Sequence, residues 1–249
     1  MDNPATAGEH LRQLRRQAGL SQLDLALITG VSQRHLSCLE TGRAKPSPGT
    51  LHHLLSALET PLEQCNRVFL AAGFAPRYTA TPLASPAMTA IREAVSHVLH
   101  ANNPAPAILL GSHWEVLAAN ASTGVLLELV GVTPPMEGLN LLTTLLQPGG
   151  LGDHLINAEE IRTLAWQRAS REALGNPVLA ALLASLPAPA HTTPPAEMPP
   201  LVLTRLDSSR GELNFLSTFT TFGMPQDITL TALRIEHLIP ADDATWQVM

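Results

Sequence analysis

The chain has 249 residues, of which 45% are hydrophobic and 14% charged, and its formal net charge is −6. A sequence this apolar can bury a large core, which excludes a wholly disordered protein, and its length allows two domains. The charge is uneven, because residues 1–78 contain 8 Lys and Arg against 6 Asp and Glu, whereas residues 79–249 contain 7 against 15. A weakly basic first part joined to an acidic body is typical of a protein that brings only its first part to nucleic acid.

The compartment is indicated by three sequence features. Cys38 and Cys65 are the two cysteines, and they lack CxxC spacing, which favours a reducing environment. The first ten residues do not have the basic stretch and apolar run of a signal peptide. No run of 18 or more apolar residues predicts a membrane span. We therefore expect a soluble, cytoplasmic protein with no membrane partner.

Residues 1–74 are predicted to form an all-α domain of five short helices. Ser21 and Ser32 each precede an apolar-periodic run, as N-cap residues do. Two further helices are expected to begin near Pro48 and Pro61, because a proline in the first turn of a helix loses no hydrogen bond.

The second and third predicted helices have the spacing of a helix-turn-helix. Ala26 lies four residues after Gln22, and Gly30 a further four residues on. Ala26 must be small where the next helix crosses it, and Gly30 can adopt a positive φ at the turn. The alternative is an ordinary five-helix bundle whose polar residues face solvent.

In a helix-turn-helix, the second helix enters the major groove with its first residues towards the base edges. Gln33 and Arg34 occupy these positions, and they suit adenine and guanine respectively as bidentate partners. Gln22, Arg43 and Lys45 would lie near phosphates. The predicted DNA-binding residues are Gln22, Ser32, Gln33, Arg34, His35, Ser37, Cys38, Arg43 and Lys45.

Residues 75–104 are predicted to link two domains. The segment up to residue 88 is rich in Pro, Ala and Thr and has no apolar period. A helix is expected over residues 89–102, where Ile91, Val95, Val98 and Leu99 share one side.

Residues 105–249 are predicted to form an α+β domain. Two short strands flank the turn "GSHW", several Leu-rich helices follow, and three strands end the chain, the last expected over residues 228–240. In the middle one of these three, Leu213, Phe215 and Phe219 alternate onto one face. This order favours helices that cover a five-stranded antiparallel sheet.

Both parts resemble known families. The stretch "LRQLRRQAGLSQLDLALITGVSQRHLSCLETGRAKPSPGTLHHLLSAL" resembles the lambda-repressor-like helix-turn-helix of the XRE family of regulators. The stretches "PAILLGSHWEVLAANASTGVLL", "LNLLTTLLQPGG" and "GELNFLSTFTTFGMPQDITLTALRIEHLIPADDAT" resemble the ligand-binding domain of MmyB-like regulators. The resemblance implies a DNA-binding transcriptional regulator whose second domain is PAS-like and binds a small apolar ligand, with a fatty acid as the favoured candidate.

The chemistry of the second part allows such a ligand without requiring it. The second part has more leucines than are needed to cover one face of a sheet. These leucines could line a ligand cavity or fill a solid core, and the sequence leaves both interpretations open. The residues predicted to bind the ligand are Trp114, Leu117, Leu126, Leu142, Leu145, Trp166, Arg162, Arg205, Phe215 and Phe219. The cationic candidates for a carboxylate head group are Arg162, Arg168, Arg171, Arg205 and His154, although residues of this kind are more often solvated surface residues than ligand anchors.

Other classes of protein fit the sequence less well. An enzyme is not expected, because the chain has no GxxxxGK or GxSxG motif and the adjacent Asp242 and Asp243 would diverge. A metal site is not expected either, since His97 and His100 have no Cys or carboxylate at ligand spacing. Apart from a bound fatty acid, no cofactor is predicted.

The remaining hypotheses concern assembly. A homodimer is expected, because two helix-turn-helix domains about one helical turn apart read an inverted-repeat operator in double-stranded DNA. The alternative function keeps DNA binding but makes the second domain a ligand-free module for dimerisation or protein interaction.

Overall fold

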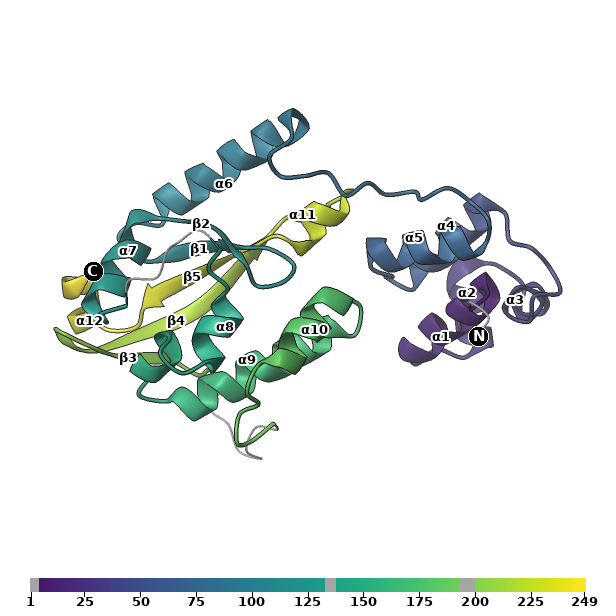
Figure 1. The fold of residues 1–249 in the computed structure, drawn as a ribbon. Helices are drawn as coiled ribbons and strands as arrows, with labels where there is room; N and C mark the ends of the chain where they lie inside the picture. The colour runs from purple at the N-terminus through teal and green to yellow at the C-terminus, as the bar shows by residue number, and fades with distance from the viewer. Residues whose placement is uncertain (1–4, 133–137, 193–199) are drawn as a thin grey trace. The chain divides into compact units, whose positions relative to one another are not determined.

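The computed structural model describes residues 5–132, 138–192 and 200–249, and they form two compact units. The first unit extends to residue 81 and includes residues 225–231; the second contains residues 82–224 and 232–249. The connecting segment predicted at 75–104 is therefore divided between them (Figure 1).

Five helices make up most of the first unit. They are α1 (Ala7–Gln17), α2 (Gln22–Thr29), α3 (Gln33–Glu40), α4 (Pro48–Ala57) and α5 (Leu62–Ala71). Ser21 and Ser32 cap α2 and α3 as predicted, since each side-chain oxygen accepts a hydrogen bond from a backbone N–H in the first turn. Gly30 ends α2 in the left-handed conformation, with φ of 68°. The predicted all-α head with a helix-turn-helix is confirmed.

Asp227 explains why residues 225–231 belong to the first unit. Its carboxylate accepts hydrogen bonds from the hydroxyl groups of Thr79 and Thr81, at 2.8 and 2.7 Å. Burial raises the pKa of Asp227, but these hydrogen bonds outweigh burial and the pKa is lowered overall. The ionised carboxylate therefore joins two segments that are nearly 150 residues apart in the sequence.

The second unit is built on a five-stranded antiparallel sheet with the strand order β2-β1-β5-β4-β3. The strands are β1 (Ala107–Leu110), β2 (Val116–Ala119), β3 (Thr204–Ser208), β4 (Gly211–Thr221) and β5 (Arg234–Pro240). β5 lies in the centre because both β1 and β4 pair with it. The predicted α+β fold and its sheet are confirmed.

Helices cover both faces of this sheet (Figure 1). The helical segments of the second half of the chain are η1 (Pro86–Met88), α6 (Thr89–Ala101), α7 (Ala121–Leu129), α8 (Leu141–Leu146), η2 (Leu151–His154), α9 (Ala158–Ala173), α10 (Pro177–Ser185), α11 (Ile228–Ala232) and α12 (Asp243–Val248). α6 lies against one face, here called the outer face. On the opposite, inner face, leucines of α7, α8 and α10 share a core with Leu213 and Phe215 of β4.

The predicted last strand is wrong in its first part. The strand was expected over 228–240, but residues Ile228–Ala232 form the helix α11 and β5 begins only at Arg234. Asp227 causes the turn, because its side chain accepts a hydrogen bond from the Thr229 backbone N–H at 2.9 Å. The helix α12 was not predicted; Asp242 caps it by accepting from the Thr245 N–H.

Candidate DNA-binding surface and ligand cavity

The helix α3 presents one polar side and buries the other. Gln33 and Arg34 are exposed, whereas Leu36 and Leu39 are buried in the helical core. Two polar residues at the first turn of an exposed helix, directly after a helix-turn-helix turn, are placed where base edges are read in that motif. Their contact with DNA stays a prediction.

A buried ion pair holds α3 in place. The guanidinium of Arg15, on α1, donates from Nε and Nη2 to the two carboxylate oxygens of Glu40, at 2.6 and 2.9 Å. The side chains are only 8% and 1% exposed, so the pair is shielded from solvent. Burial raises the pKa of Glu40, but hydrogen bonds from Arg15 and Gln22 outweigh it and the pKa is lowered overall. Glu40 is thus ionised, and α1 and the C-terminal end of α3 are tied together.

The other predicted DNA-binding residues lie on or beside α3, with one partial exception. Ser32 and His35 are exposed at its start, and Ser37 and Cys38 are half-buried in its middle. The exposed Arg43 and Lys45 follow its C-terminal end. Gln22 is half-buried on α2, and its amide donates to Glu40 at 2.9 Å. Part of the hydrogen-bonding capacity of Gln22 is therefore used inside the protein.

A cavity of about 110 Å³ lies between the inner face of the sheet and the helices of the second unit. A single water needs about 10–15 Å³ by a comparable measure, so the cavity has room for several carbon atoms. Its walls are Pro106, Ala107, Ile108, Val116, Thr123, Leu126, Leu127, Leu139, Leu141, Thr144, Leu145, Leu151, Ile161, Thr204, Glu236 and Leu238. Nearly all are apolar, and Glu236 is the ionisable residue among them.

Glu236 lies in the middle of β5, the central strand, deep inside the unit. Its Oε1 atom accepts a hydrogen bond from the hydroxyl of Ser217 on β4, at 2.6 Å. Burial raises the pKa of Glu236, and the Ser217 hydrogen bond and the nearby Arg234 and Arg168 offset this only in part. The side chain keeps some accessible surface because it faces the cavity.

A cluster of charged and aromatic side chains adjoins Glu236. Arg234, two residues earlier on the same face of β5, has its guanidinium 4.8 Å from the ring centroid of Trp114 and 3.4 Å from a carboxylate oxygen of Glu172. Glu172 also accepts from the Trp114 indole N–H at 2.8 Å and from Arg168 at 2.9 Å. Arg234 is buried, and its Nε and Nη2 atoms have no hydrogen-bond partner among the described residues. Two buried N–H-bearing atoms of Arg234 are therefore available to bind a ligand or a water molecule.

The predicted ligand-binding residues are distributed over several places. Leu126 and Leu145 line the cavity. Leu142, Phe215, Trp114 and the half-buried Trp166 belong to the surrounding core, without lining the cavity. Their role in binding a ligand stays a prediction.

Three further predicted ligand-binding residues interact with other side chains and do not line the cavity. Arg162 donates to the Leu145 carbonyl at 2.9 Å and pairs with Asp153 at 2.8 Å. Arg205 pairs with Glu212 on the surface. Phe219, 42% exposed, lies beneath the guanidinium of Arg168, 4.0 Å from its ring centroid. The structure thus places Arg168, and not Arg162 or Arg205, beside the charged cluster.

Glu236 was missed by the sequence analysis. The sequence "RIEHLIP" does contain an indication, since Arg234, Glu236 and Leu238 alternate onto one face of a strand whose other face carries Ile235, His237 and Ile239. Two charged residues on the inner face of a central strand need partners or a function. The periodicity alone did not identify Glu236, because the strand was expected to begin at residue 228 and the strands that pair with it were not known from the sequence.

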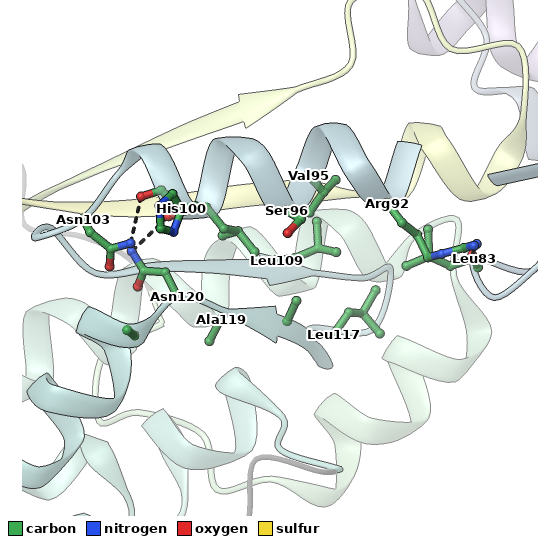
Figure 2. Close-up of a pocket in the computed structure, with 13 residues that line it drawn as sticks. Leu83, Arg92, Val95, Ser96, His100, Asn103, Leu109, Leu117, Ala119 and Asn120 are labelled. Carbon is green, nitrogen blue, oxygen red and sulfur yellow. Dashed lines mark hydrogen bonds between the residues drawn. The ribbon is translucent and has the colours of Figure 1, made fainter. Parts of the chain in front are cut away.

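A second hollow, a groove of about 410 Å³, lies on the outer face between α6 and the strands β1 and β2. Figure 2 shows Asn103 and Asn120 at one end of it and Arg92 and Leu83 at the other. Leu117, predicted to bind the ligand, faces this groove and not the cavity. Asn120 caps α7 as predicted, accepting from the Thr123 N–H at 3.1 Å.

The described residues contain neither a membrane-spanning helix nor a cluster of side chains suited to a metal ion. Among them, no helix is long and apolar enough to cross a membrane. Within the same ranges, no three His, Cys, Asp or Glu side chains are grouped so that they could hold a metal ion.

A helix-turn-helix unit in one chain with an α+β unit that contains a cavity is the architecture of a DNA-binding transcriptional regulator with a ligand-binding domain. Comparison with known proteins agrees: residues 6–68 match the family described as "Helix-turn-helix domain", and residues 91–249 match "MmyB-like transcription regulator ligand binding domain". The second match spans more than half of the chain, so the chain belongs to the MmyB-like family of transcription regulators. The resemblance seen in the sequence is confirmed.

The first unit also has a curated relative. The chain is 41% identical over 58 residues to the uncharacterized HTH-type transcriptional regulator y4dJ of Sinorhizobium fredii. The aligned region is 23% of this chain and 75% of that protein. The likeness is therefore one of helix-turn-helix domains.

Proposed function

We propose that the protein is a cytoplasmic, homodimeric regulator that binds an inverted-repeat operator through α3 and changes its affinity for that operator when a fatty acid occupies the cavity. The observation that supports ligand sensing is the cavity itself, because apolar side chains of the sheet and four helical segments leave space among them. Well-packed interiors have few voids larger than a water molecule. A cavity of about 110 Å³ inside a domain therefore supports the hypothesis that a ligand binds there.

The energetics favour an apolar chain as the ligand. Each buried CH₂ group contributes about 0.8 kcal/mol, so the several carbons that fit the cavity of about 110 Å³ gain roughly 3–4 kcal/mol before costs. A tail of about a dozen carbons gains on the order of 10 kcal/mol if the helices that line the cavity move apart to admit it. Association and ordering remove several kcal/mol of this gain. Micromolar or tighter binding of a long chain therefore requires the cavity to widen when the ligand enters.

The DNA-binding half of the proposal depends on the solvent exposure of the first turn of α3. Gln33 and Arg34 are free to reach a base edge, because Ser32 caps α3 just before them and Leu36 anchors the helix from its other side. Phosphate contacts are assigned to Arg43 and Lys45. Two copies of α3, one from each protomer, read the two half-sites.

Ligand control requires two arrangements of the dimer that bind ligand unequally. The helix α6 is the candidate for transmitting the change, since it follows the first unit in the chain and lies against the sheet of the second. A ligand with equal affinity for both arrangements would change nothing, however tightly it bound.

The test has two parts. Full-length protein purified under mild conditions is extracted with organic solvent, and the extract is analysed by mass spectrometry; a stoichiometric acyl species is expected. Binding sites are then selected from random duplexes with and without the extracted lipid, and an inverted repeat whose affinity depends on the lipid is expected. Repeated empty extracts together with lipid-independent DNA binding would instead support a ligand-free interaction module.

A further inference from the structure

Among the residues that line the cavity, one is ionisable, and it lies on the central strand. Glu236 pairs across the sheet with Ile108 on β1 and with Phe219 on β4, so its side chain emerges from the middle of the inner face. Ser217, also on β4, donates its hydroxyl hydrogen to one carboxyl oxygen at 2.6 Å. Every other residue that lines the cavity is apolar or threonine. Glu236 is therefore the one lining residue whose charge state can respond to the head group of a ligand.

Two guanidinium groups lie close to this position. Arg234 is two residues along the same face, so its Cα atom is roughly 7 Å from that of Glu236. Arg168 lies over the ring of Phe219, the cross-strand neighbour of Glu236, at 4.0 Å from the centroid. One carboxylate, that of Glu172, contacts both guanidinium groups, and two donors of Arg234 are buried without a partner among the described residues. The surroundings of Glu236 are therefore able to stabilise one negative charge.

We propose that Glu236 determines the specificity of the cavity by forming a hydrogen bond with the carboxylate of a straight-chain monocarboxylic ligand, while Arg168 and Arg234 stabilise the single negative charge that the two carboxyl groups share. This inference rests on the proposed function, because it names the head-group position of the same cavity. An alcohol or ester of equal chain length brings no charge for the guanidinium groups to stabilise, and so binds more weakly.

The charge state of Glu236 agrees with this arrangement. Two ionised carboxylates side by side repel each other, whereas two carboxyl groups that share one proton carry one negative charge and a strong hydrogen bond. Burial raises the pKa of Glu236, which favours the protonated form before ligand binds. The charged groups that act on Glu236 are Arg234 on its own strand and Arg168 on α9; Arg234 in turn faces Glu172 and Glu115.

The experiment compares three ligands that share one twelve-carbon chain. Dodecanoate, dodecan-1-ol and methyl dodecanoate are titrated into delipidated full-length protein by calorimetry, between about pH 6 and pH 9. Loss of one charge-assisted hydrogen bond changes affinity by about tenfold or more. We expect the wild-type protein to bind dodecanoate at least about tenfold more tightly than the other two ligands, and less tightly as the pH rises and the shared proton is lost.

Variants separate the role of the carboxyl group from that of the cavity wall. Glu236→Gln keeps a hydrogen-bond donor that does not titrate, so dodecanoate affinity should stay within about threefold and lose its pH dependence. Glu236→Leu should weaken dodecanoate binding by about tenfold and abolish the preference over dodecan-1-ol. Glu128→Gln, at an exposed position on α7, is the matched control and should change nothing.

Each contrary result has a distinct meaning. Tighter dodecanoate binding by Glu236→Gln, by tenfold or more, would show that an ionised Glu236 repels the ligand and would overturn the inference. Equal binding of all three ligands by the wild-type protein would overturn the inference and leave the cavity a ligand site. Binding of none of them, with empty extracts, would refute the proposed function as well. Circular dichroism checks folding; if Glu236→Leu does not fold, Glu236→Gln and the ligand series decide.

Discussion

The buried pair between Arg15 and Glu40 offers a quantitative test of how α3 is held. In a Glu40→Gln variant the Arg15 guanidinium remains in a site where its side chain is only 8% exposed, but it faces a neutral amide. One Arg15 donor loses its acceptor, since the amide of glutamine has one oxygen in place of two. Breaking a buried ion pair by altering one partner costs about 3–5 kcal/mol, and glutamine retains one hydrogen bond, so we expect a loss of about 3 kcal/mol.

This loss is large enough to measure on the whole protein. For a domain of 60–100 residues, 1 kcal/mol shifts the unfolding midpoint by about 4–8 °C, so the transition of the first unit should fall by about 12–24 °C in calorimetry. Glu63→Gln is the matched control, because Glu63 and Arg67 form an exposed i,i+4 pair whose contribution is about 0.5 kcal/mol or less. If both variants melted within about 2 °C of each other, the pair would not be what holds α3 in place.

The remaining predictions concern DNA binding and pH. Arg34→Ala should cost about 1–3 kcal/mol of operator affinity and relax specificity at one base position, as measured by fluorescence anisotropy on single-base variants of the selected operator; a uniform loss would make Arg34 a phosphate contact. Arg43→Ala should weaken binding to all sequences and reduce the slope of log affinity against log salt by about 1, and an unchanged slope would remove Arg43 from the phosphate contacts. Burial lowers the pKa of His237 from 6.5, so the unfolded chain takes up a proton first as pH falls, and the second unit should lose stability below about pH 6.5. His237→Gln should reduce that loss in urea unfolding at about pH 7.5 and 5.5; a loss as large as that of the wild type would show that other groups cause it.

The helix-turn-helix was predictable from the sequence because its determinants are local. Caps at Ser21 and Ser32 and a turn at Gly30 depend on residues within four positions of one another. The exposure of Gln33 and Arg34 followed from the same periodicity. What periodicity could not show is the pairing of Arg15 with Glu40, which are 25 residues apart and lie on different helices.

The number and direction of the strands were predictable from the sequence, but the side chains that surround Glu236 were not. The alternation of Leu213, Phe215 and Phe219 indicated one face of the strand; Leu213 and Phe215 are buried there, whereas Phe219 is 42% exposed. The same alternation in β5 gives no information about which residues of β1, β4 and α9 face Glu236. Arg162 and Arg205 were chosen as anchors by charge alone, and each has a nearby acidic partner that periodicity does not reveal.

By itself, the sequence determined the caps and the turn of the helix-turn-helix, which residues of α3 are exposed, and that a five-stranded antiparallel sheet forms the second unit. Those properties depend on short-range capping and on the period of apolar residues, and both can be counted along the chain. Only the tertiary structure decided that a cavity remains beneath the sheet, that Glu236 is the ionisable residue that lines it, and that Trp114, Glu172 and Arg234 come into contact near Glu236. These three residues are separated by about 60 positions at each step. Their meeting depends on strand register and helix packing, which no local pattern specifies.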